Sequence, residues 1–338
     1  MLVRTISTLL SNMKIDVIIG NPPYQDEVEA KGNSAKALYH KFILQSKEYN
    51  GKSVFIVPAR WFTGGLGLGD FKDLQLNCGN IVEMVYFPKS KDIFETVDIS
   101  GGVVILYQDE SITRERCIYS VVLEGKLVEK SERKPNEFSI FISNSTVASI
   151  VRKIQRRIGK AQTIGQTLKS LPSYRISTSY RGKRGTNTYY KVLTSKGLYE
   201  IDTVYKENLG YRPYISRIAS EHSGHPDKNG RYKVPSSVGI LDEETICSDS
   251  YAPIQKFDTL KEAQNMEKYL KSKFLRAIVQ SGLVGIHVNK NSFNFVPMQD
   301  FTENSDIDWE KDVDSQLYNK YGLSLEEINH IEKTIKSI

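Results

Sequence analysis

Short apolar runs separated by amphipathic stretches mark the first 110 residues of the chain. Between the first two runs, Leu38, Phe42 and Ile43 recur at the spacing of one helical face, and residues 71–76 predict a second helix. A strand, a helix and a strand joined by short links form a parallel unit, so this half is predicted to be an α/β sheet. The apolar runs predict buried strands at residues 15–19, 54–57, 81–87 and 101–107.

The rest of the chain is less regular. Residues 109–140 alternate charged and β-branched positions and predict a solvent-exposed hairpin, and residues 145–158 predict a helix. Thr259 and Glu262 form a capping box, which predicts a helix that runs to about Gln280. Two short amphipathic helices are expected near the C-terminus. We therefore expect three domains, at residues 1–144, 145–300 and 301–338.

Charge is distributed unevenly along the chain. It has 46 basic and 40 acidic residues, a net charge of +6. Residues 151–235 contain 18 lysines and arginines and 5 acidic residues, 18 − 5 = +13, whereas residues 1–150 contain 17 and 18. Eight of the 19 tyrosines lie between Tyr174 and Tyr214. A positive field confined to one block indicates a polyanionic partner more strongly than a diffuse field does.

Other features of the composition narrow the class of protein. The three cysteines, Cys78, Cys117 and Cys247, are far apart, which is typical of a reducing cytoplasm and offers no metal cluster. His222 and His225 have no third ligand nearby, so a polar loop is expected there in place of a metal site. No apolar run reaches membrane-spanning length. The first ten residues contain one arginine and a short apolar stretch, a pattern too weak to predict a signal peptide. We expect a cytoplasmic protein with no metal and no membrane partner.

The most informative stretch follows the first predicted strand. Gly20 ends the strand, and Asn21, Pro22, Pro23 and Tyr24 lie at the edge where open α/β sheets bind ligands. An amino group conjugated to a ring is a poor nucleophile because its lone pair is delocalised. Two acceptors aimed at its N–H groups, the Asn21 side-chain oxygen and the Pro22 carbonyl, favour a pyramidal nitrogen, and proline fixes the backbone in advance. Tyr24 offers a flat face for a planar group. The alternative is a proline-stiffened turn without chemistry.

An apolar strand followed by Asn-Pro-Pro-Tyr resembles the catalytic motif of amino-group methyltransferases that use S-adenosylmethionine, most typically DNA adenine-N6 methyltransferases. Residues 271–276 and 307–323 also resemble the C-terminal part of Eco57I-like restriction–modification adenine methyltransferases. The resemblance spans about residues 14–337. It implies an α/β protein with a partial Rossmann-like methyltransferase sheet, followed by an α+β target-recognition domain and a C-terminal helical hairpin.

The resemblance also implies roles for particular residues. Asn21, Pro22, Pro23 and Tyr24 would form the catalytic platform for an adenine flipped out of double-stranded DNA. In this family, an aromatic residue near the last strand usually holds the base against the platform's tyrosine. The candidates here are Tyr107 and Phe94, and ordinary core packing is the alternative for both.

The basic, tyrosine-rich block is predicted to read the DNA, since cations can follow phosphates and aromatic rings can stack on bases. The alternative is a solvated β-rich surface with tyrosines packed beneath it. The candidate DNA-binding residues are Tyr180, Arg181, Lys183, Arg184, Lys191, Arg212 and Arg217.

The chain departs from the family at the cofactor site. Complete enzymes have a strand, a glycine-rich turn and an acidic residue before the catalytic motif, and only 20 residues precede Asn21. Residues 64–69 are glycine-rich, but five residues separate them from the preceding strand, so a flexible loop is expected there. The binding half for S-adenosylmethionine is therefore expected on a separate polypeptide, unless the chain is a fragment or the gene is truncated. The isolated chain would then expose a sheet edge.

Two other functions stay open at this stage. Asn-Pro-Pro-Tyr also serves enzymes that methylate a protein glutamine or ribosomal RNA, although the long basic block favours DNA. The missing cofactor half is also consistent with an inactive DNA-binding remnant or a specificity subunit.

Overall fold

The structure is a computed structural model of the 338-residue chain. The chain divides into two compact units between Ser143 and Asn144. The polar stretch 26–35 lies outside the described residues, and so do His222 and His225. The structure describes residues 15–25, 36–49, 51–65, 67–159, 161–168, 173–182, 190–201, 209–218, 226–283 and 288–338.

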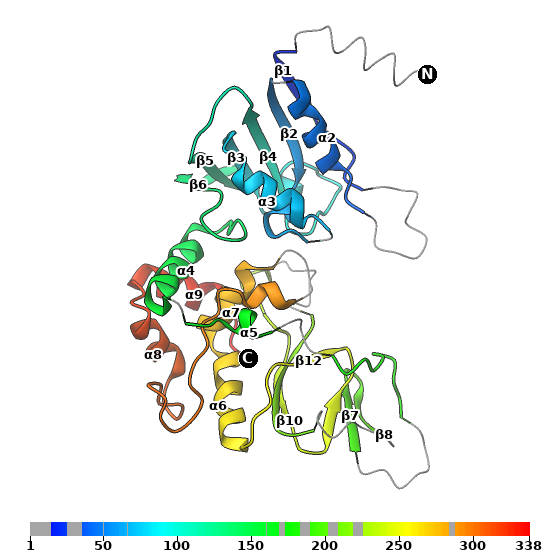
Figure 1. The fold of residues 1–338 in the computed structure, drawn as a ribbon, viewed down its shortest axis with the longest axis vertical. Helices are drawn as coiled ribbons and strands as arrows, with labels where there is room; N and C mark the ends of the chain where they lie inside the picture. Colours follow the sequence, from blue (N-terminus) through cyan, green and yellow to red (C-terminus); the bar gives the residue numbers. More distant parts are fainter. Residues whose placement is uncertain are drawn as a thin grey trace. The chain divides into compact units, whose positions relative to one another are not determined.

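The first unit is built on one mixed sheet (Figure 1). Strands β1 and β2 are parallel, β4 is antiparallel to both of its neighbours, and β3 and β5 are parallel. The predicted α/β class is thus confirmed, including the parallel strand–helix–strand unit at its start. The strand order is β1-β2-β4-β3-β5-β6, with bounds β1 Val17–Gly20, β2 Lys52–Pro58, β3 Ile81–Phe87, β4 Val103–Asp109, β5 Cys117–Leu123 and β6 Lys126–Arg133.

Helical segments pack on one face of this sheet. Alternate residues of β2 and β4, such as Phe55 and Leu106, join a buried cluster with Tyr39, Trp61 and Phe71 from the helical segments. Phe55 and Leu106 thus define the face that these helices cover. The segments are α2 Tyr39–Ser46, η1 Lys47–Tyr49, η2 Ala59–Thr63, α3 Gly69–Asn77 and η3 Ser90–Asp92.

Strand β1 was expected to be buried, and that expectation is wrong. Val17 is 47% exposed and Ile19 is 79% exposed. The reason is the position of β1 at the edge of the sheet, where β2 is its one strand neighbour among the described residues. An apolar edge strand of this kind is a ready template for pairing with another chain segment.

The predicted hairpin at residues 109–140 forms, but it is not simply solvent-exposed. Its first strand, β5, pairs with β3 and extends the sheet, and Cys117 and Tyr119 on β5 are buried. The Tyr119 ring packs against Phe141 at 5.0 Å. Only β6 has the largely exposed pattern that was expected. The alternating sequence predicts a free hairpin because the pairing of β5 with β3 is a long-range contact that the local pattern does not show.

The second unit combines two small sheets with several helices. The sheets have the orders β10-β9-β12 and β11-β7-β8. No helix in the described part of the chain is long and apolar enough to cross a membrane. The strands are β7 Tyr190–Thr194, β8 Gly197–Ile201, β9 Arg212–Ser216, β10 Val238–Leu241, β11 Thr245–Cys247 and β12 Tyr251–Pro253. The helical segments are α4 Ser145–Ile158, α5 Ile164–Thr167, α6 Leu260–Lys271, α7 Lys273–Ser281, η5 Lys290–Phe293, α8 Val313–Lys320 and α9 Leu325–Thr334.

The helix predicted from Thr259 to about Gln280 is in fact two helices. Ser272 ends α6 with an extended backbone, φ −59° and ψ 141°, and its side chain accepts from the Leu275 amide as the N-cap of α7. The apolar spacing continues across this break, which is why the pattern alone predicted one helix.

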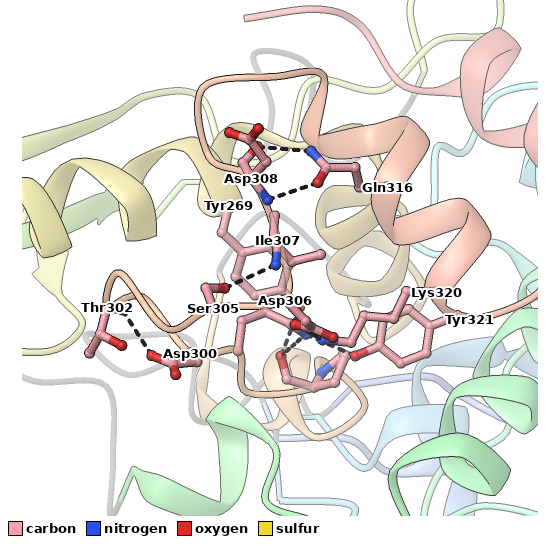
Figure 2. A network of polar contacts seen from close by, with 12 residues as sticks. Tyr269, Asp300, Thr302, Ser305, Asp306, Ile307, Asp308, Gln316, Lys320 and Tyr321 are labelled. Carbon is pink, nitrogen blue, oxygen red and sulfur yellow. Dashed lines mark hydrogen bonds and ion pairs between the residues drawn. The ribbon is translucent and has the colours of Figure 1, made fainter.

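The C-terminal helices α8 and α9 confirm the predicted helical hairpin, and a polar network secures the segment before them (Figure 2). The Gln316 side chain bonds to both the amide and the carbonyl of Asp308, each at 2.8 Å. Lys320 donates to Asp306 at 2.7 Å and to Gln299 at 2.8 Å. The acidic tail is therefore an ordered part of the second unit.

Candidate functional site

The parallel pairing of β1 with β2 positions the stretch Asn-Pro-Pro-Tyr. The paired register runs from Val17 opposite Lys52 to Gly20 opposite Phe55. A Cβ atom at Gly20 would lie 3.2 Å from the Phe55 ring, so glycine lets the strand end close against β2. The chain then leaves the sheet, because the two prolines that follow Asn21 cannot donate to a ladder.

Asn21 faces solvent at this edge. It is exposed, and its side chain makes no hydrogen bond to any part of the chain that the structure describes. Pro22, in contrast, is buried. The side-chain amide is thus available to an outside group, next to a backbone that proline holds rigid.

The Tyr24 ring is half-buried and held by two other aromatic rings. Tyr39 meets it at a centroid distance of 6.4 Å and an interplanar angle of 83°, and Phe94 meets it at 6.4 Å and 67°. Both are edge-to-face contacts, the geometry that aromatic quadrupoles favour. The Tyr24 carbonyl accepts from the Leu38 amide at 3.0 Å, which ties the platform to the start of α2. Sequence reasoning missed Tyr39, since a tyrosine at a helix start gives no signal that it will brace a distant ring.

Burial shifts the pKa of two groups at or near the platform. Desolvation raises the pKa of Tyr24 to about 12, and its hydroxyl is buried without a hydrogen-bond partner in the described structure. Burial, followed by the neighbouring Lys41, lowers the pKa of His40 below its ordinary value of 6.5. Tyr24 therefore offers a ring face and a neutral hydroxyl near neutral pH.

The structure separates the two candidate stacking residues. Phe94 lies against Tyr24, on the loop between β3 and β4. Tyr107 lies on the row of Val54 and Ile19, and the chain must run five residues beyond Ile19 to reach Tyr24. Tyr107 alternates with Leu106, whose side chain joins the buried cluster against which Tyr24 packs, so Tyr107 lies on the opposite face of the sheet. Phe94 is thus brought to the platform, and Tyr107 is not.

Three of the candidate DNA-binding residues gather near strands β7 and β8. The Tyr180 hydroxyl donates to the Glu200 carbonyl at 2.7 Å, and the Arg181 guanidinium lies 5.7 Å from the centre of the Tyr199 ring. Lys191 is exposed on β7. These contacts fix the loop that carries Tyr180 and Arg181 against the sheet.

The other candidates are placed differently. Arg212 and Arg217 lie at the start of β9 and just after it, and both are half-buried. The Arg217 Nε atom donates to the Tyr251 carbonyl at 3.2 Å, so this side chain takes part in the packing of the unit. Lys183 and Arg184 lie outside the described residues.

The glycine-rich segment at residues 64–69 differs from the phosphate-binding loop of a nucleotide site. The segment follows the 3₁₀ helix Ala59–Thr63 instead of leaving β2 directly. Its Gly64 adopts φ +75° to end that helix, which is an ordinary role for glycine. A backbone cradle that opens straight from a strand, as nucleotide sites have, is not formed by this segment.

Comparison with known proteins bears on the region around the strand that ends in Asn-Pro-Pro-Tyr. Residues 4–94 match the family described as Eco57I restriction-modification methylase. An uncharacterized adenine-specific methylase from Mycoplasma pneumoniae is 32% identical over 146 residues, 42% of this chain and 34% of that protein. The predicted resemblance to Eco57I-like methyltransferases is thus confirmed in this region. The chain spans about a third of the length of this curated relative.

Two solved restriction–modification enzymes resemble the whole chain more weakly. The type IIL enzyme MmeI, solved in complex with DNA, is 11% identical with a TM-score of 0.49, covering 96% of this chain and 55% of MmeI. The type IIG restriction endonuclease BpuSI is 10% identical with a TM-score of 0.36, covering 94% of this chain and 49% of BpuSI. Both TM-scores lie below 0.5, which is too low to indicate a shared function.

Replacing Tyr24 by phenylalanine should not destabilise the first unit. The hydroxyl is buried and has no hydrogen-bond partner among the described residues, so its removal is expected to leave the free energy of unfolding unchanged or raise it by up to about 1 kcal/mol. The raised pKa implies that wild-type stability falls as the pH rises from 10, the ordinary value, through about 12. The Tyr24→Phe variant has no hydroxyl to ionise, so the part of this fall in stability that comes from Tyr24 should be absent. Denaturant unfolding at pH 7 and pH 11 measures both effects.

Tyr119→Phe is the matched control. Its hydroxyl is also buried, but it donates to the Ser143 carbonyl at 2.7 Å, so this variant should lose about 1 kcal/mol at pH 7. An equal loss in both variants would show that the Tyr24 hydroxyl has a partner in solution.

Proposed function

We propose that this chain is the catalytic and target-recognition portion of a site-specific adenine-N6 DNA methyltransferase of a restriction–modification system, acting in the cytoplasm. The observation that carries the proposal is an exposed Asn21 amide, without a hydrogen-bond partner among the described residues, close in sequence to a Tyr24 ring that Tyr39 and Phe94 contact edge to face. The Eco57I family match over residues 4–94 and the adenine-specific relative support it.

The chemistry follows from the acceptors at this edge. The Asn21 side-chain oxygen and the Pro22 carbonyl accept from the two N–H bonds of the adenine amino group, which favours a lone pair directed away from the ring. The flipped base stacks on Tyr24, with Phe94 on its other side, and flipping costs a few kcal/mol of lost pairing and stacking. S-adenosylmethionine, when bound, would supply the methyl carbon and leave as S-adenosylhomocysteine as the new N–C bond forms and the C–S bond breaks. The proton that the amino group then loses would pass to solvent, so the step needs no charged residue of the motif.

The cofactor-binding half is proposed to pack against the β1 edge, either as a separate polypeptide or as another part of a longer chain. Val17 and Ile19 present apolar side chains there, and β1 has a free edge in the described structure. A neighbouring strand would cover them and bring the cofactor next to Asn21, since ligands bind at the carboxyl ends of such strands.

The second unit is proposed to bind double-stranded DNA. Arg181 and Lys191 lie near strands β7 and β8, within the block of residues 151–235 whose net charge is +13. Tyr180, Lys183, Arg184, Arg212 and Arg217 are proposed to belong to the same interface. Phosphate contacts by such cations provide affinity, while base contacts provide the choice of site.

Replacing Asn21 by alanine in the complete enzyme should lower methyl transfer to duplex DNA at least about 100-fold, the usual effect of removing one preorganised polar group. DNA affinity should change less than about twofold, because Asn21 lies outside the basic block. A labelled-methyl assay on duplex DNA, ribosomal RNA and total protein, with a binding assay in parallel, measures both. Asn136→Ala, an exposed asparagine of the same unit that bonds to Asn77, is the control.

The outcomes separate the alternatives. Label in RNA or in protein glutamine instead of DNA would identify a methyltransferase with another substrate. DNA binding without any transfer by the complete enzyme would identify a specificity subunit or remnant. Loss of DNA binding in Asn21→Ala would mean that the platform is only structural.

The chain by itself should bind S-adenosylmethionine weakly or not at all, because the described residues do not form a site for it. Isothermal calorimetry with the purified chain should show no heat at micromolar cofactor. Adding the proposed cofactor-binding half should produce both binding and a stable complex. Micromolar affinity of the pure chain would contradict this prediction.

Replacing Arg181 and Lys191 together by alanine should weaken binding to a random-sequence duplex and reduce its salt dependence. Each lost phosphate contact lowers the slope of log K against log salt by about 0.9, so a change of about 2 is expected. Lys261→Ala is the control, since Lys261 lies outside the basic block and pairs with Glu310. An unchanged slope in the double variant would remove both residues from the interface.

A further inference from the structure

The loop between β3 and β4 is organised around one buried serine. Ser90 is only 1% exposed. Its Oγ atom donates to the Val97 carbonyl at 3.0 Å and accepts from the Ile99 amide at 2.8 Å. Its own carbonyl accepts from the amides of Ile93 at 3.0 Å and Phe94 at 2.8 Å. One residue thus joins the two limbs of the loop and also bonds to the backbone of the ring that faces Tyr24.

The ends of the same loop are fixed to the sheet. Gly102 adopts φ +73°, and a Cβ atom there would lie 2.3 Å from the Phe87 carbonyl oxygen, so only glycine fits. The Gly102 carbonyl accepts from the Ala59 amide at 3.0 Å. On the other limb, the Asp92 carboxylate accepts from the Glu124 amide at 2.7 Å. Hydrogen bonds therefore fix the ends of the loop, and the hydrogen bonds of Ser90 hold its exposed middle in place.

The position of Phe94 matters because the gap beside Tyr24 is narrow. The two centroids are 6.4 Å apart with the rings at 67°. A base is about 3.4 Å thick, as the rise between stacked bases shows, so a sandwich needs about 7 Å between parallel rings. The observed separation is slightly shorter than that, so a planar group can enter only when the Phe94 ring turns its face toward Tyr24 and moves slightly away from it, while the loop backbone keeps its position.

We propose that Ser90 is a positioning residue, whose hydroxyl holds the Phe94 loop at the separation from Tyr24 that accepts a flipped base. This inference rests on the proposed function and adds a residue that the Asn-Pro-Pro-Tyr motif does not contain. Ser90 acts through Phe94 and does not touch the base. Without the hydroxyl, the Val97 carbonyl and the Ile99 amide lose their partner, and the limbs of the loop separate.

The first test uses the chain alone. Hydrogen exchange of the Phe94 and Ile99 amides should be at least about tenfold faster in Ser90→Ala than in the wild type, a difference of about 1.4 kcal/mol in opening. Ser46→Ala is the matched control, because Ser46 is a buried serine of the same unit that donates to the Ile43 carbonyl at 2.8 Å. Wild-type exchange of both amides in Ser90→Ala would show that the hydroxyl does not hold the loop.

The second test measures methyl transfer by the complete enzyme. The substrates are a duplex that the wild type methylates and the same duplex with the target adenine placed opposite an abasic site. Ser90→Ala should lower kcat/KM about tenfold on the paired adenine and less than threefold on the unpaired one, because an unpaired base needs less stabilisation outside the helix. In a Phe94→Ala background, Ser90→Ala should add less than a twofold loss.

Each outcome bears on a different claim. Equal losses on the two substrates, or full losses in the Phe94→Ala background, would overturn the positioning role and indicate general damage to the unit. If Ser90→Ala behaves like Ser46→Ala while the wild type methylates DNA, only this inference fails. If the wild type methylates no adenine in duplex DNA, the proposed function fails first.

Discussion

The parallel pairing of β1 with β2 is the constraint on which the candidate site depends. Its register pairs Gly20 with Phe55 and so determines the point at which the chain leaves the sheet at Asn21. Strand β2 continues into η2, and the Ala59 amide at the start of η2 donates to the Gly102 carbonyl at the end of the Phe94 loop. A slip of one residue in this pairing would turn Ile18 from the packed face to the exposed face and move all of these groups together.

Strand β1, which positions the candidate site, is also the shortest strand of its sheet and lies at the edge of that sheet. It has four residues, one paired edge and an apolar residue, Ile19, that is mostly exposed. In the proposed enzyme, a partner strand along β1 would stabilise the sheet and fix the Asn21 platform in the same step. Binding of the cofactor half and readiness of the platform would then be coupled, because both depend on the order of β1.

The sequence predicts what local pattern controls. Strand–helix–strand order, the ends of β3 and the Thr259 cap of α6 all follow from apolar spacing and capping residues. The sequence does not show contacts between distant segments. The pairing of β5 with β3, the contact of Tyr39 with Tyr24 and the break at Ser272 each depend on tertiary packing that outweighs local preference.

The same holds within the site. Phe94 and Tyr107 are equivalent candidates as aromatic residues in the sequence, and the ring contact of Phe94 with Tyr24 distinguishes them.

The residues of the platform limit what it is proposed to recognise. Asn21 and the Pro22 carbonyl are proposed to present oxygen acceptors beside the Tyr24 ring, and burial raises the pKa of the Tyr24 hydroxyl to about 12, so it is neutral at ordinary pH. Such a set favours a neutral planar group that carries N–H bonds, since Asn21, the two prolines and Tyr24 include no carboxylate that would hold a charged amine such as lysine. The amino group of adenine and the amide of glutamine both satisfy that requirement. The platform therefore cannot choose between them by its own chemistry. In the proposed function, the choice falls to the second unit, where cations and tyrosines are concentrated and phosphate supplies the complementary charge.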